Sequence, residues 1–142
     1  MLDNEKNVLK WTAIIVLGNL SRVDNKNKID KILPRLMANL SDKSLITASN
    51  SIKSLAKIGK YKPKHQKQIL NSILKVEKVT YYNKGEPSPE CRNVVIGHAL
   101  DVISELGSDL INNKKVIAFI KRQTKNSRSS VQRRVKNLLK KI

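Results

Sequence analysis

Basic side chains far outnumber acidic ones in this sequence, and their distribution along the chain indicates what the protein could bind. The 142 residues include 29 Lys and Arg but only 11 Asp and Glu, which gives a formal net charge of +18. Residues 43–75 hold eight Lys and no acid, and residues 110–142 hold eleven Lys or Arg and no acid. Such a field attracts polyanions and raises their encounter rate. An AT-rich genome would also enrich Lys, Asn and Ile, but that bias does not explain why acids are absent from these two stretches.

The residue types that usually perform catalysis are few and far apart in the sequence. His65 and His98 have no second His, Cys or carboxylate at the spacing that metal ligands require. The single cysteine, Cys91, has no histidine near it in the sequence. A phosphate-binding glycine loop and a nucleophile elbow are also missing. The sequence therefore predicts no catalytic residue, no bound metal and no cofactor, and it favours a binding protein over an enzyme.

Composition also bears on compartment and size. The N-terminal residues lack the basic region of a signal peptide, and the longest apolar run is too short to cross a bilayer. A lone cysteine cannot form an internal disulfide, so nothing indicates an oxidising compartment. A chain of 142 residues is long enough to bury a core within one domain. We expect a single-domain cytoplasmic protein without membrane insertion.

A helical sequence pattern occurs four times along the chain, and the helices that it predicts would carry or support the basic side chains. The copies lie at residues 8–20, 46–59, 94–107 and 131–142, and they superpose on Leu17, Leu55, Ile103 and Leu139. The intervals of 38, 48 and 36 residues are close to those of two-helix solenoid repeats. We therefore expect Leu17, Leu55 and Ile103 to be buried.

The pattern between the copies predicts at least six helices, in antiparallel pairs, and no sheet. We expect repeats at about 4–40, 42–79, 90–124 and 129–142, the last being a half repeat, with an inserted loop at 80–89. In that loop, one of Tyr81 and Tyr82 either fills space beneath the loop or stacks on a base. We expect helix caps at Asp3 or Asn4 and at Asp24 or Asn25, and a bend or shifted start at Pro34. A helix should start at Pro63, one should end at Gly59 in a left-handed conformation, and one should end at Gly107. One helix should run from Ser108 or Asp109 to about Thr124.

Residues 32–59 resemble a HEAT repeat. Members of this family carry a proline in one helix, an aspartate in the turn, and a small residue and a leucine in the next helix; Pro34, Asp42, Ser51 and Leu55 match these places. The resemblance implies an all-α, right-handed α-α superhelix of the HEAT or armadillo-like type, whose second helices line a concave face that binds proteins and in some members nucleic acid. The family's turn aspartate pairs with an arginine of the neighbouring repeat. Here the arginine place holds Lys10, Ala48, Ile96 and Gln132, which predicts an absent or degenerate ladder.

Basic residues follow one side of each expected second helix when the sequence is projected at about 100° per residue. Asp30 and Glu77 fall to the side in this projection, so we expect an acid-free basic groove. Its ten candidate polyanion-binding residues are Lys28, Lys31, Arg35, Lys64, Lys67, Lys75, Lys114, Lys115, Lys121 and Arg122.

The sequence favours a non-enzymatic scaffold that binds an acidic macromolecule, either nucleic acid or an acidic protein segment. The alternative is a protein-protein adaptor that uses the apolar ends of the stack, with the lysines serving solubility. A more remote alternative is a relative of the HEAT-like alkylpurine DNA glycosylases, for which Trp11 and Asp101 would be the aromatic and carboxylate candidates. An exposed apolar patch on the last helix would favour the adaptor.

Overall fold

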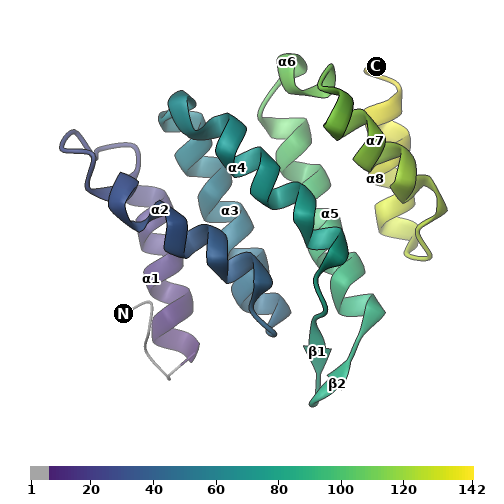
Figure 1. The fold of residues 1–142 in the computed structure, drawn as a ribbon, viewed down its shortest axis with the longest axis horizontal. Coiled ribbons are helices and arrows are strands. Elements are labelled where there is room, and N and C mark those ends of the chain that lie inside the picture. The colour runs from purple at the N-terminus through teal and green to yellow at the C-terminus, as the bar shows by residue number, and fades with distance from the viewer. Residues whose placement is uncertain (1–6) are drawn as a thin grey trace.

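The fold is mostly helical. The computed structural model describes residues 7–142, and within that range it contains eight α-helices, joined by short connections and four 3₁₀ turns (Figure 1). The expectations of an all-α protein and of at least six helices are therefore confirmed. The expected caps Asp3 and Asn4 lie outside the described residues.

The helices form two layers (Figure 1). In the first layer, each helix packs on the next one in the series α1 (Asn7–Leu20), α3 (Leu45–Tyr61), α5 (Pro89–Glu105) and α8 (Ser129–Leu139). The second layer contains α2 (Lys28–Ala38), α4 (Gln66–Ile73) and α7 (Lys114–Arg122). The 3₁₀ turns are η1 (Asn39–Ser41), η2 (Pro63–His65), η3 (Leu74–Lys78) and η4 (Gln123–Lys125), and the short α6 (Ser108–Ile111) precedes α7.

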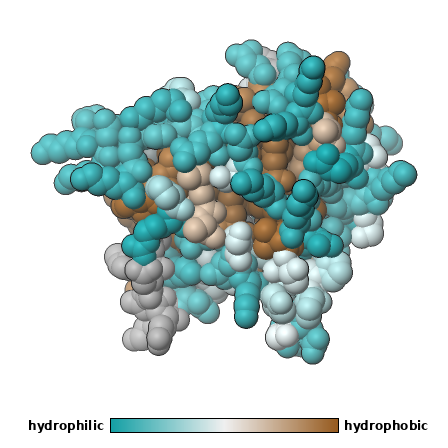
Figure 2. Space-filling view, viewed as in Figure 1, coloured by the Kyte–Doolittle hydropathy of each residue, from teal (hydrophilic) through white to brown (hydrophobic). Residues whose placement is uncertain are grey.

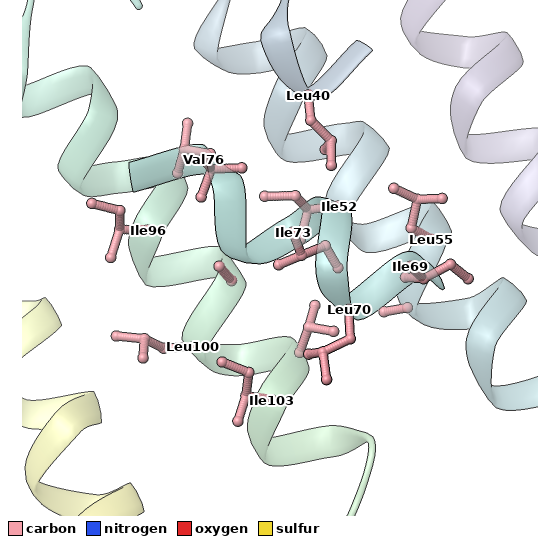
Figure 3. Close-up of a cluster of buried hydrophobic side chains, with 14 of the residues drawn as sticks. Leu40, Ile52, Leu55, Ile69, Leu70, Ile73, Val76, Ile96, Leu100 and Ile103 are labelled. Atoms are coloured by element: carbon pink, nitrogen blue, oxygen red, sulfur yellow. The ribbon is translucent and has the colours of Figure 1, made fainter. Parts of the chain in front are cut away.

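The core lies between the two layers because each helix turns its apolar side toward the other layer. Leu55 of α3, Ile73 of α4 and Ile103 of α5 are completely buried within it (Figure 3). The repeat pattern predicted Leu55 and Ile103 correctly. It was wrong for Leu17, which is only partly buried. The reason is that α1 is an end helix: in the described chain it has a first-layer neighbour, α3, on one side only.

Small residues let α1 and α3 approach closely. A Cβ atom at Gly18 would lie 2.7 Å from the Ser54 hydroxyl oxygen and 2.8 Å from the Ser54 Cα. The Ser54 hydroxyl donates a 2.6 Å hydrogen bond to the carbonyl oxygen of Ile14, which helix α1 already uses. This polar contact and the missing side chain fix how α1 lies on α3.

Two helix boundaries differ from those expected. Gly59 does not end α3 in a left-handed conformation; it is buried within α3, which continues to Tyr61. The helix expected from Ser108 to Thr124 is split into α6 and α7, since the Asn113 side chain accepts a 2.9 Å hydrogen bond from the Lys115 N–H and caps a new helix. Gly107, with φ 104°, does end α5 as expected.

The expected loop at 80–89 contains a short hairpin, so the prediction of no sheet was wrong. Strands β1 (Tyr82–Asn83) and β2 (Glu86–Pro87) pair antiparallel around Lys84 and Gly85, which have φ values of 51° and 78°. Positive φ at both central residues is the backbone of a type I′ turn. Strands of two residues are too short to show an alternating pattern in sequence.

Tyr81 anchors this hairpin to the core. Its ring is fully buried, and its hydroxyl donates a 2.5 Å hydrogen bond to the carbonyl oxygen of Leu40. Burial raises the pKa of the Tyr81 hydroxyl, so it stays a donor. Tyr81 therefore fills space beneath the inserted segment and is not available to stack on a base.

The buried position of Leu55 yields a stability prediction. Truncation of a fully buried leucine loses transfer free energy and leaves a cavity, so Leu55→Ala should lower the free energy of unfolding by roughly 2–5 kcal/mol. Leu139 occupies the equivalent place in the last copy but is 38% exposed, so Leu139→Ala is the matched control, with an expected change of about 0.5 kcal/mol or less. Urea unfolding measures both. Equal losses for the two variants would contradict the core described here.

Candidate functional site

All ten candidate cations lie on the second layer and are exposed to solvent. Because the opposite side of these helices packs on the first layer, the cations project outward; we call this surface the basic face. Figure 2 views the molecule from this side and shows hydrophilic side chains extending from it. Helix α2 carries Lys28, Lys31 and Arg35; the η2–α4–η3 segment carries Lys64, Lys67 and Lys75; and α7 carries Lys114, Lys115, Lys121 and Arg122.

The basic face is not free of acids, which corrects the expectation. The Asp30 carboxylate lies 2.7 Å from the Lys64 ammonium, and the Glu77 carboxylate lies 2.6 Å from the Arg122 guanidinium. Arg122 donates from both Nε and Nη2 to Glu77, and these hydrogen bonds raise the pKa of the guanidinium. A helical projection places a side chain around its own helix only, so it could not show that these acids reach a neighbouring helix.

Lys62 was missed by the sequence reasoning, and it is the most buried cation among the described residues. Its ammonium lies 3.1 Å from Asp24 Oδ2 and 3.4 Å from Asp30 Oδ1, and it donates a 2.7 Å hydrogen bond to the side chain of Asn27. Burial alone would lower the pKa of Lys62, but the hydrogen bonds and charges of the two carboxylates raise it. The cluster ties the start of α2 to the connection between α3 and α4.

Asp24 has a second role in this cluster. Its carboxylate accepts 2.9 Å hydrogen bonds from the N–H groups of Lys28 and Ile29, the first two residues of α2. The N-cap residue itself is Asn27, so the expected cap position at Asp24 or Asn25 was wrong, although Asp24 still satisfies the first N–H groups of the helix. Pro34 lies inside α2, not at a shifted start. The hydrogen bond from Ile29 is the main reason why the pKa of Asp24 is lowered; for Asp30 the main reason is the hydrogen bond from Lys64.

Further ion pairs join successive helix pairs. Lys10 of α1 lies 3.0 Å from Asp42 in the turn before α3, and Arg134 of α8 lies 2.7 Å from Asp101 of α5. The ladder expected to be absent or degenerate thus has one rung, in which Lys10 takes the arginine place opposite the turn aspartate. Most acidic side chains of the described chain therefore hold helices together.

A groove crosses the basic face between η3 and α7. It has a volume of about 460 Å³. The Glu77–Arg122 pair connects its two sides, and Gln123 adds a 3.0 Å hydrogen bond to Glu77. Its lining residues are Asn71, Leu74, Lys75, Glu77, Lys78, Lys115, Ala118 and Arg122.

The candidate catalytic types are dispersed. His65 lies 3.2 Å from Asp30, whereas His98 is on α5, where burial lowers its pKa. Cys91 is a buried free thiol, and no three His, Cys, Asp or Glu residues of the described chain could together hold a metal ion. The two residues considered for a glycosylase lie in the first layer, where Trp11 donates to Thr47 and Asp101 pairs with Arg134.

A scan against protein-family models, a search of curated proteins and a search of solved structures found no match to this chain. None of the helices in residues 7–142 combines the length and the apolar composition needed to cross a bilayer.

The Lys62 cluster should make stability depend on pH. The pKa values of Asp24 and Asp30 are depressed in the folded protein, so their contribution is present above the unfolded value of about pH 4 and is lost as the pH falls below it. Lys62→Met should lower the melting temperature at neutral pH and weaken this acid-induced loss. Lys67→Met, which removes an exposed lysine, is the control. Thermal unfolding followed by circular dichroism at several pH values checks this; acid sensitivity unchanged in Lys62→Met would contradict it.

Proposed function

We propose that this protein is a non-enzymatic binding scaffold that uses its basic face to hold a polyanionic partner. The main support for this proposal is that seven exposed lysines of the basic face have no carboxylate within ion-pair distance among the described residues. A surface in which cations repel one another without local compensation favours an external anion. These lysines are Lys28, Lys31, Lys67, Lys75, Lys114, Lys115 and Lys121.

The proposed architecture is a right-handed HEAT-like superhelix with the second layer on its concave side. Three features support it: the helices follow one another in pairs, Pro34 lies within the second helix of the first pair, and Asp42 in the next turn pairs with Lys10. Neighbouring helices in a packed layer lie about 8–10 Å apart. Stripes on α2, α4 and α7 would then merge into one ribbon that can follow a linear polyanion.

Reversal of charge on the basic face tests this proposal. The triple variant Lys67→Glu, Lys114→Glu, Lys121→Glu should weaken binding of an oligonucleotide or of poly-glutamate and flatten its salt dependence, by about 0.9 in log-log slope for each duplex phosphate that the variant no longer neutralises. The matched control is Lys53→Glu, Lys136→Glu, Lys140→Glu, which changes the net charge equally on exposed residues of α3 and at α8. Fluorescence anisotropy across a salt series measures both. Equal losses in the two variants would mean that net charge alone controls binding.

A second candidate function, the protein-protein adaptor, is favoured by one observation. The outer side of α1 exposes a row of apolar side chains, and contiguous exposed apolar surface is typical of docking sites. An exposed apolar patch on the last helix would have favoured the adaptor; Leu139 and Ile142 are partly exposed there, but the first helix exposes more apolar side chains. The most exposed of these are Val8 at 68%, Leu20 at 47%, and Ile15 and Val16 at 44% each.

The adaptor candidate predicts association through α1. A second copy of the chain is the simplest helical partner to measure, at a salt concentration high enough to screen the like charges. Ile15→Glu combined with Val16→Glu should leave the fold intact, because both side chains are already exposed, and should abolish concentration-dependent association in sedimentation velocity. Leu139→Glu, at the opposite end of the stack, is the control and should leave association unchanged. Association that persists in the α1 variant would remove this candidate's support.

A further inference from the structure

The groove between η3 and α7 has an apolar floor. A site that bound only the charges of a polyanion would not require such an apolar surface. Leu74 from η3 and Ala118 from α7 are both partly buried in it. Neither side chain can donate a hydrogen bond to a phosphate. Figure 2 shows apolar surface lying between the hydrophilic side chains of this face. The floor therefore suits a ligand that brings an apolar group along with its negative charges.

The two sides of the groove are basic. Lys75 and Lys78 come from η3 and Lys115 from α7, and all three are exposed. The one carboxylate in the lining, Glu77, is only 13% exposed, and its two oxygens accept hydrogen bonds from Arg122 and Gln123 at 2.6–3.1 Å. Glu77 is thus neutralised in place, where it also ties η3 to α7. An anion entering the groove meets lysines on both sides.

The lining contains no aromatic residue. Proteins that hold single-stranded nucleic acids combine a basic groove with aromatic side chains on which bases stack, and that second component is missing here. A volume of about 460 Å³ is within the range of small binding sites. A ligand with an aliphatic side chain flanked by carboxylates would fit this groove, because the aliphatic group matches the apolar floor and the carboxylates match the lysines at the sides.

On this basis we infer that the preferred partner of the basic face is an acidic polypeptide segment that places one aliphatic side chain on Leu74 and Ala118 while its carboxylates meet Lys75, Lys78 and Lys115. This inference rests on the proposed function and narrows its partner from any polyanion to an acidic peptide with an apolar anchor.

The experiment uses three labelled probes and two arginine variants of the full chain. The probes are a 12-residue glutamate-rich peptide with one central leucine, the same peptide with serine in place of leucine, and a 12-nucleotide single strand. Ala118→Arg fills the groove without lowering the positive charge. Ala38→Arg adds the same charge at an exposed position at the end of α2 and is the matched control. Leu74→Gln removes part of the floor with no charge change and is the second test variant should Ala118→Arg fail to fold.

The leucine peptide should bind the unmodified chain about 5- to 10-fold more tightly than the serine peptide, since a leucine gains by leaving water. That preference should disappear in Ala118→Arg and in Leu74→Gln and persist in Ala38→Arg. Equal affinities for the two peptides, or tighter binding of the oligonucleotide than of the leucine peptide, would overturn the inference while leaving the proposed function standing. If none of the three probes bound at low salt, the proposed function would fail as well.

Discussion

Acidic side chains are scarce in this protein, and most of those that the structure describes are used in ion pairs between neighbouring helices. The sequence has 11 acidic residues for 29 basic ones, and six of those acids form ion pairs that the structure describes: Asp24, Asp30, Asp42, Glu77, Glu90 and Asp101. Their partners are 32 to 45 positions away in the sequence, which is about one repeat. Acids that are used to join neighbouring pairs cannot also neutralise the surface. Because so few acids remain, the outward side of the second layer stays cationic.

The cost of burying charge explains where these pairs lie. Lys62 is almost fully buried, and such an ammonium is stable only when several acceptors replace its water. Asp24 and Asp30 supply these acceptors, and Asp24 in turn depends on the N–H groups at the start of α2 for its own low pKa. The start of the second layer is therefore fixed by hydrogen bonds to charged groups, while its length is fixed by apolar packing on the first layer.

Much of the fold could be predicted from the helical periodicity of the apolar residues. Leu55 and Ile103 could be placed in the core because apolar residues at helical spacing must share one face, and Gly107 could be placed at a helix end. Gly59 could not be distinguished from Gly107 in this way, since both follow an apolar helical pattern, yet Gly59 lies within α3 and Gly107 lies after the end of α5. The sequence also left open whether Tyr81 is buried or exposed, because the hydrogen bond that its hydroxyl donates to the carbonyl oxygen of Leu40 joins distant parts of the chain. The basic face was predictable because its cations share one side of each helix. The ion pairs that Asp30 and Glu77 form on that face depend on distances between helices, which cannot be read from the spacing of residues within one helix.

On this proposal, a polyanion binds to the outward side of the second layer. Amide chemical shifts of the labelled protein, followed while poly-glutamate or an oligonucleotide is added, test this most directly. The perturbed amides should belong to α2, to the η2–α4–η3 segment and to α7, with the largest changes around Lys75 and Lys115 beside the groove. Perturbations confined to α8, whose Arg133 and Lys136 are also exposed, or to the outer side of α1, would contradict it.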